Sequence, residues 1–134
     1  MYPETTNKKR VLIADDDDHV RRSLEYALCE EDFDASGAAS GQEALDTLRT
    51  EPFDLLLIDD SLFDMRLEDV LRTVRSFEIQ PVIVVLQAVP RLGAAARFAA
   101  LGASDAVGRW NSRRDIIESI RHCLASCELE IAHA

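Results

Sequence analysis

The chain has few of the residues that crosslink small secreted domains, and it lacks the long apolar runs that cross bilayers. Only three cysteines occur among 134 residues, and this odd number favours reduced thiols over a disulfide framework. No apolar run reaches the roughly 18 residues that a membrane-spanning helix needs. The first ten residues are polar, without the apolar stretch of a secretory signal. These absences favour a cytoplasmic protein that makes no membrane contact.

Basic residues are also in short supply. Fifteen Lys and Arg stand against 25 Asp and Glu, so the formal net charge is −10 at pH 7. An acidic field repels phosphate backbones and anionic membrane surfaces, so nucleic acid is not expected as a direct partner. The same field favours cations and basic protein surfaces.

Short apolar segments rich in β-forming residues occur at intervals along the chain. The strongest are 10–14, 53–58 and 82–86, and weaker candidates are 33–37 and 103–108. Runs such as LLLI and VIVVL are apolar on both faces, which is typical of buried parallel strands rather than of a half-exposed antiparallel sheet.

Segments with helical periodicity lie between and after these strands. They are expected at about 20–28, 42–50, 67–77, 91–101 and from residue 111 or 112 towards the C-terminus. Ser40 is expected to cap the second helix, with Glu43 at the N3 position of a capping box. Gly102 is a natural left-handed cap for the fourth helix.

A strand followed by a helix, five times over, predicts an α/β domain with a parallel sheet covered on both faces. Residues 10–125 are expected to form this domain, with 1–9 as a disordered or extended tail and 126–134 as a helical extension or tail. In that extension, Cys127 and Ile131 would continue an apolar seam towards a partner or a following domain. Ligands of such folds bind beyond the carboxyl ends of the strands, so functional residues are expected there.

Acidic residues follow two of the predicted strands directly. Four aspartates at 15–18 come after VLIA, and Asp59 and Asp60 come after LLLI. If these strands are neighbours, at least three carboxylates converge at one sheet edge, and a hard divalent cation would relieve their repulsion. An all-oxygen site with free water positions suits Mg²⁺. The alternative is that acids at 16–18 merely favour a helix N-terminus; this explains one or two of the four aspartates but not the second pair.

Three runs together resemble the receiver domain of bacterial two-component response regulators: VLIADDDDHVRRSLEYAL, FDLLLIDDSLFDMRLEDVLRTVR, and PVIVVLQAV leading to ALGASDAVGRW. The resemblance covers roughly residues 10–125 and implies a flavodoxin-like (βα)5 fold with strand order 2-1-3-4-5. It implies that Asp15 and Asp16 hold Mg²⁺, together with Asp59 and the backbone carbonyl of Ser61. It also implies that Asp59 accepts a phosphoryl group from a histidine kinase.

The resemblance implies partners as well. A histidine kinase or phosphotransfer protein would meet the first helix, which carries Arg21 and Arg22, and the acidic site. A homodimer or output partner would use the face formed by 91–101, 103–108 and the last helix, beside Trp110. Apart from accepting a phosphoryl group from a donor and losing it slowly, the chain is not expected to be an enzyme.

Two departures from the family pattern fall where receivers respond to phosphate. The short hydroxyl residue that usually ends the fourth strand is missing. Gln87 or Leu86 stands there, because counts from the two ends of this region disagree by one residue. The usual lysine–proline pair is replaced by Arg109 and Trp110. Arg109 keeps the positive charge, but it presents a planar fork instead of a compact ammonium group.

A third departure follows Asp59. Phe63 and Leu67 stand where proline and glycine are usual, and Asp60 adds an acid beside the acceptor position. If the glycine position needs a positive φ, Leu67 implies a reshaped loop or an earlier helix start.

Three functional hypotheses follow. In the first, the domain binds Mg²⁺, is phosphorylated on Asp59 and transmits the event through an altered switch. In the second, it is a degenerate receiver that acts as a protein-interaction module without phosphorylation. The third, an Mg²⁺-dependent phosphohydrolase of the haloacid dehalogenase type, is disfavoured because Ser61 stands where that family has a second aspartate.

Overall fold

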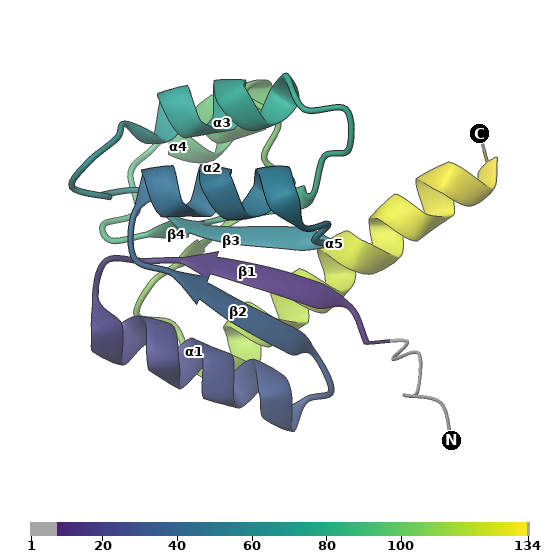
Figure 1. Cartoon of the computed structure of the whole chain (residues 1–134), viewed down its shortest axis with the longest axis horizontal. Helices are drawn as coiled ribbons and strands as arrows, with labels where there is room; N and C mark the ends of the chain where they lie inside the picture. The colour runs from purple at the N-terminus through teal and green to yellow at the C-terminus, as the bar shows by residue number, and fades with distance from the viewer. Residues whose placement is uncertain (1–7, 134) are drawn as a thin grey trace.

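The structure is a computed structural model that describes the backbone of residues 8–133 and the side chains of residues 8–130. Strands and helices alternate along the described chain (Figure 1). They are β1 (Arg10–Ala14), α1 (Asp18–Glu30), β2 (Asp34–Ala38), α2 (Gly41–Thr50), β3 (Leu55–Asp59), α3 (Leu67–Arg75), β4 (Val82–Gln87), α4 (Ala94–Ala100), β5 (Asp105–Gly108) and α5 (Arg113–His133). The strands form one parallel sheet in the order β2-β1-β3-β4-β5, which confirms the predicted fold class.

Both faces of the sheet are covered. Figure 1 shows α2, α3 and α4 on one face of the sheet and α1 and α5 on the other. The side chains of the central strand β3 alternate between two apolar cores, with Leu56 and Ile58 in the first and Leu55 and Leu57 in the second. Complete burial of one such side chain contributes about 1.5–3 kcal/mol. The run LLLI gains this energy on both faces only in the interior of the sheet, where helices cover both sides.

The predicted caps are present. The Ser40 hydroxyl accepts a hydrogen bond from the Glu43 backbone N–H at 3.0 Å, while the Glu43 carboxylate accepts one from the Ala39 N–H at 3.2 Å. Gly102 has a φ of +102° and follows α4 as expected. Asp17 caps α1 by accepting from the N–H groups of the next turn, so this helix begins at Asp18.

The main error in the predicted boundaries concerns α4. Residues 91–93 were expected in this helix, but it begins only at Ala94 because Gly93 turns the chain with a φ of +83°. The strand starts predicted at 53 and 103 lie too early, since β3 begins at Leu55 and β5 at Asp105. The third helix ends at Arg75, two residues before the predicted end.

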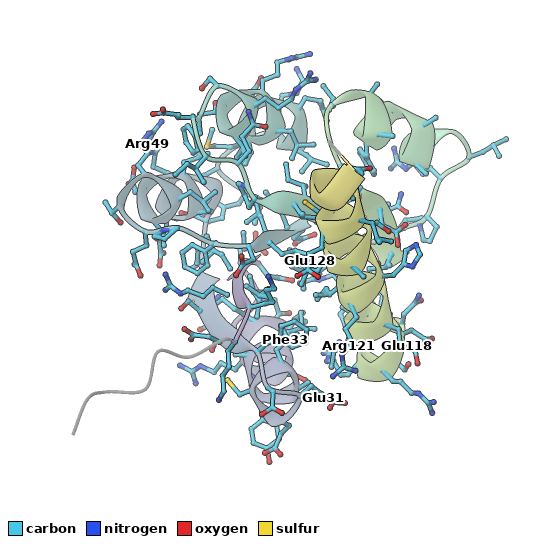
Figure 2. The ribbon with its side chains drawn as sticks, turned by 90° about the vertical axis from the view of Figure 1, so that its right-hand side faces the viewer. Glu31, Phe33, Arg49, Glu118, Arg121 and Glu128 are labelled. Atoms are coloured by element: carbon cyan, nitrogen blue, oxygen red, sulfur yellow. The ribbon has the colours of Figure 1, made fainter. Side chains whose placement is uncertain are left out.

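Helix α5 joins the sheet to a projecting end. Ile117, Ile120 and Leu124 are buried against the sheet, as expected, and the last turns then extend away from it (Figure 1). Arg121 lies 3.4 Å from the Glu31 carboxylate and above the Phe33 ring, so α5 is fastened to the loop after α1 (Figure 2).

Two expectations about the termini fall partly outside the described residues. The predicted tail at 1–9 includes residues 1–7, which the structure does not describe, and the side chain of Ile131 also lies outside the description. Cys127 is half-buried on α5.

The cysteines are free thiols, as predicted, and Cys123 belongs to the core. None of the described helices combines the length and the apolar character that a bilayer crossing requires.

Candidate functional site

The pairing of β1 with β3 brings the acidic residues together. Ala14 pairs with Ile58 in this parallel ladder, so the next residues, Asp15 and Asp59, lie side by side at the carboxyl ends of the two strands. One carboxylate oxygen each of Asp15, Asp16 and Asp59 lies within 4.8 Å of the others. Asp15 and Asp59 are buried, with 0% and 1% of their surface exposed. The predicted convergence of carboxylates at this edge is therefore confirmed.

Local backbone contacts hold the two buried carboxylates. The Asp17 N–H donates to Asp15 Oδ1 at 2.9 Å. The N–H and the hydroxyl of Ser61 both donate to Asp59 Oδ1, at 3.2 and 3.1 Å. The second oxygen, Asp59 Oδ2, is buried and receives no hydrogen bond from any described residue. A buried charged oxygen without a donor is unfavourable, and it indicates a position for a cation or another ligand.

The electrostatics of Asp59 lead to the same conclusion. Burial raises the pKa of Asp59 above its ordinary value, and the charge of Asp15 raises this pKa further. Arg109 and the hydrogen bonds from Ser61 oppose the increase without cancelling it. Ionised Asp59 is thus disfavoured until more positive charge enters the site.

The donor set suits a hard divalent cation. Asp15, Asp16 and Asp59 supply carboxylate oxygens, and Asp59 Oδ2 accepts no hydrogen bond from any described residue. Mg²⁺ prefers oxygen ligands and binds through a few carboxylates while it retains water molecules. The residues present therefore fit a magnesium ion.

Arg109 reaches this cluster from the end of β5. Its guanidinium donates to both oxygens of Asp15, from Nη2 at 2.7 Å and from Nε at 3.1 Å. Nη2 lies 3.9 Å from Asp59 Oδ2. The guanidinium carbon also lies 5.0 Å from the ring centre of Trp110, whose side chain is exposed. The structure thus brings the predicted residue Arg109 into the site.

The register of β4 decides between Gln87 and Leu86. The pairing of β4 with both neighbours is continuous, so the sheet has no bulge there. Leu86 is fully buried in the core beneath α1 and α5. Gln87 ends the strand and lines a cavity of about 210 Å³ together with Asp60 and Ser61. It is therefore Gln87 that stands beside the acidic site.

Asp60 and Asp64, for which the sequence predicts no role, hold neighbouring loops together by accepting hydrogen bonds from backbone N–H groups. The Asp60 carboxylate accepts the Ala88 N–H at 3.2 Å and so connects the loop after β3 to the loop after β4. Asp64 accepts the N–H groups of Gly41 and Gln42 at 2.9 and 3.0 Å, which fixes the β3–α3 loop to the start of α2. These partners are distant in sequence, so no local sequence pattern predicts these hydrogen bonds. Asp17 was detectable, since an aspartate before a helix is a common cap.

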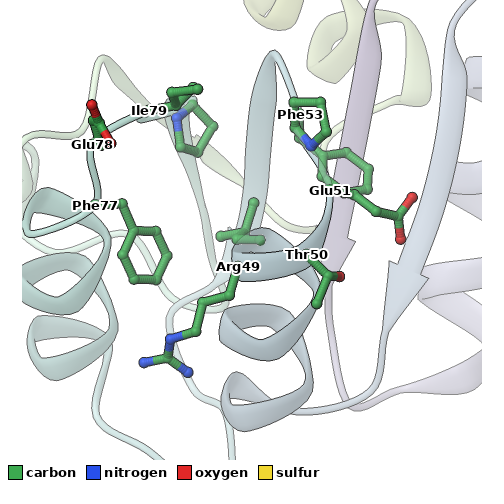
Figure 3. A pocket seen from close by; sticks show the side chains of 10 residues that line it. Arg49, Thr50, Glu51, Phe53, Phe77, Glu78 and Ile79 are labelled. Carbon is green, nitrogen blue, oxygen red and sulfur yellow. The ribbon is translucent and has the colours of Figure 1, made fainter.

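A different cavity lies at the opposite edge of the sheet, where β3 and β4 begin. It has a volume of about 410 Å³ and is lined mainly by Leu48, Pro52, Phe53, Phe77, Ile79 and Pro81. Figure 3 shows the Arg49 side chain beside Phe77, and its guanidinium carbon lies 5.4 Å from the ring centre. This cavity is at the far end of the strands from the carboxylates, so its residues take no part in the acidic site.

Known proteins share both the fold and the sequence pattern. The cell cycle response regulator CtrA of Brucella ovis is 29% identical over 111 residues, which cover 83% of this chain and 48% of CtrA. This chain thus spans about half the length of the curated relatives it matches. A CheY-like response regulator receiver domain from Methanospirillum hungatei superposes with a TM-score of 0.85 at 27% identity, covering 92% of this chain and 99% of that one.

A further solved structure supports the fold alone, because its sequence identity is low. The receiver domain of a LuxO repressor protein from Vibrio parahaemolyticus superposes with a TM-score of 0.86 at 22% identity, covering 93% of this chain and 96% of that one. The family model of the response regulator receiver domain matches residues 11–121. That match includes β1 from Val11 onward, the other four strands and the acidic site, and this chain belongs to the response regulator receiver domain family.

Proposed function

We propose that this domain is a phosphoacceptor in a two-component or phosphorelay pathway and is phosphorylated on Asp59 in a reaction that needs Mg²⁺. The observation that carries the proposal is Asp59 Oδ2, a buried carboxylate oxygen without a hydrogen-bond donor, beside the carboxylates of Asp15 and Asp16. An oxygen in this position is available both to a cation and to an incoming phosphorus atom.

The chemistry divides between the residues as follows. Asp15, Asp16, Asp59 and the backbone carbonyl of Ser61 would hold Mg²⁺, which when bound offsets the negative charge of the phosphoryl oxygens. An Asp59 oxygen forms a bond to phosphorus while the bond from phosphorus to the donor's imidazole nitrogen breaks. Ser61 holds Asp59 Oδ1 through two hydrogen bonds, so this carboxylate keeps one orientation.

The response to the phosphoryl group would pass through Gln87 and Arg109. Gln87 is buried and lines the cavity beside Asp60 and Ser61, so its amide N–H would donate to a new phosphoryl oxygen there. Arg109 lies 3.9 Å from Asp59 Oδ2 and can pair with phosphate as well as carboxylate. We propose that they replace the hydroxyl and the lysine of other receivers.

Partners would dock on two faces. Arg22 of α1 is exposed, whereas Arg21 is engaged with Asp18, so a histidine kinase or phosphotransfer protein would meet Arg22 and the acidic edge. A homodimer or output partner would use the α4-β5-α5 face, where Trp110 is exposed. We place this activity in the cytoplasm, with residues 10–125 as the receiver unit and residues 126–134 as an extension.

Two observations favour a second function, a phosphorylation-independent interaction module. Arg109 already occupies both oxygens of Asp15, and the short hydroxyl at the end of β4 is absent. In that case the fold would present surfaces to a partner without any change at Asp59.

Incubation with acetyl phosphate and Mg²⁺, followed by Phos-tag electrophoresis, separates the two functions. The phosphoacceptor predicts a retarded band that Asp59→Ala removes and that Asp60→Asn, a change at the adjacent acid, retains. A wild-type chain that stays unshifted with and without Mg²⁺ would instead support the interaction module.

A further inference from the structure

Arg109 places a cation of this chain inside the carboxylate cluster. Besides its two bonds to Asp15, its Nη2 lies 3.9 Å from both Asp17 Oδ2 and Asp59 Oδ2. Only 11% of the Arg109 side chain is exposed. One guanidinium therefore meets three carboxylates in a setting where solvent screens little of the attraction.

The position of Arg109 is fixed from several directions. Its backbone N–H donates to the Gln87 carbonyl at 2.8 Å, and a turn follows in which the Asn111 N–H donates to the Gly108 carbonyl at 3.0 Å. The Trp110 ring lies against the guanidinium. A lysine at this position has no planar fork for two parallel bonds to Asp15, so the arrangement depends on arginine.

This arrangement has a direct consequence for a divalent cation. Asp15 Oδ1 already accepts from Arg109 and from the Asp17 N–H, and Asp15 Oδ2 accepts from Arg109 Nε. A cation that binds Asp59 Oδ2 also meets the positive charge of Nη2, which is 3.9 Å from that oxygen. Like charges this close repel strongly in a partly buried site.

We propose that Arg109 is a tethered competitor of the metal ion: it neutralises the acidic cluster when no metal is bound and lowers the affinity of the site for Mg²⁺. This inference rests on the proposed Mg²⁺-dependent function. Binding of Mg²⁺ then requires Arg109 to release part of its contact with Asp15. The site therefore fills with Mg²⁺ only at a higher Mg²⁺ concentration than the same carboxylates would need without Arg109.

Calorimetric titration of Mg²⁺ into the 134-residue chain tests the proposal. Arg109→Gln is expected to bind Mg²⁺ on the order of tenfold more tightly than the wild type, because it removes the competing charge. Arg109→Lys keeps the charge without the fork, and its affinity is expected to lie between the two. The control is Arg49→Gln, the same loss of charge at the opposite edge of the sheet, which should leave the affinity unchanged.

Thermal unfolding gives a second readout that does not depend on phosphorylation. The melting temperature of Arg109→Gln should be lower than that of the wild type without metal and should rise more when Mg²⁺ is added. If Arg109→Gln does not fold, Arg109→Lys decides, and an affinity equal to or below that of the wild type overturns the proposal.

The outcomes also separate this inference from the proposed function. If the wild type binds Mg²⁺ and is phosphorylated on Asp59, but neither Arg109 variant gains affinity, the competition is refuted and the phosphoacceptor stands. If neither the wild type nor any variant binds Mg²⁺, both proposals fall. Tighter binding by Arg109→Gln, with an intermediate affinity for Arg109→Lys and an unchanged one for Arg49→Gln, supports the competition.

Discussion

The two halves of the acidic edge differ in how they follow the receiver pattern. On the β1 and β3 side, Asp15, Asp16 and Asp59 occupy the expected positions and converge within 4.8 Å. On the β4 and β5 side, Gln87 and Arg109 replace a short hydroxyl and a lysine. The carboxylates proposed to hold a cation are thus retained while the positions proposed to respond to phosphate have changed, and different strands supply the two sets.

The largest expected effect concerns the cation side. Asp16→Asn should weaken Mg²⁺ binding by about 100-fold or more, since even groups that only support a metal ligand are worth about 10–100-fold. Calorimetric titration measures the change. Asp18→Asn is the matched control, because Asp18 is an exposed acid two residues later that pairs with Arg21. Unchanged Mg²⁺ affinity in Asp16→Asn would show that Asp16 is not a ligand of the metal ion.

The next effect concerns the stability of the metal-free site. Asp59→Asn should raise the free energy of unfolding at pH 7, because burial and the charge of Asp15 raise the pKa of Asp59 and so make its ionised form unfavourable in the folded chain. Urea unfolding in the presence of a chelator measures it. Asp46→Asn, at an exposed acid on α2, should change stability by less than about 0.5 kcal/mol.

The pH dependence follows from the same pKa. Burial and Asp15 raise the pKa of Asp59 above its ordinary 3.8, so the folded chain keeps this proton to higher pH than the unfolded chain. The associated stability is present below pH 3.8 and is lost as the pH rises through the raised value. Asp59→Asn should abolish that loss, and a variant with the wild-type pH profile would contradict the assignment.

The third effect concerns the β4 side. Gln87→Ala should reduce the affinity for beryllofluoride, a phosphoryl mimic, by about three- to tenfold, the value of one hydrogen bond, and should leave Mg²⁺ affinity unchanged. Trp110 fluorescence reports the binding. Gln80→Ala is the control, because the Gln80 amide bonds backbone carbonyls near the opposite edge. Equal loss of Mg²⁺ binding in Gln87→Ala would show that the two halves are not separable.

The smallest effect concerns the support of Arg109. Trp110→Ala should lower the free energy of unfolding by about 0.5–1 kcal/mol through the lost cation–π contact, as measured by urea unfolding with circular dichroism. Phe63→Ala is the control, since Phe63 is exposed to 76% and Trp110 to 69%. An equal change in both variants would mean that the ring merely covers surface.

The sequence was sufficient where a pattern has one structural solution. Apolar runs on both faces require a doubly covered parallel sheet, and parallel strands deliver their following residues to one edge, so the convergence of Asp15 and Asp59 could be predicted. The start of α4 could not be predicted. The alanine-rich segment favours helix, and only the left-handed backbone conformation of Gly93 keeps the helix from beginning before Ala94.

Contacts between distant residues were also beyond reach. Arg109 bonds Asp15 across 94 positions, and the ambiguity between Gln87 and Leu86 needed the register with β3 and β5 to resolve it. Such pairings depend on how the strands align in space, and neither composition nor periodicity records that alignment.

The bond from the Ala88 N–H to Asp60 acts as a mechanical link between two loops. The Asp60 N–H also donates to the Leu86 carbonyl. Both the side chain and the backbone of Asp60 therefore hold the start of the loop after β3 to the end of β4. An outward swing of Ala88 must either break the carboxylate contact or drag the β3–α3 loop with it. Asp64 in turn accepts from Gly41 and Gln42, so hydrogen bonds connect the end of β4, the β3–α3 loop and the start of α2 without Arg109.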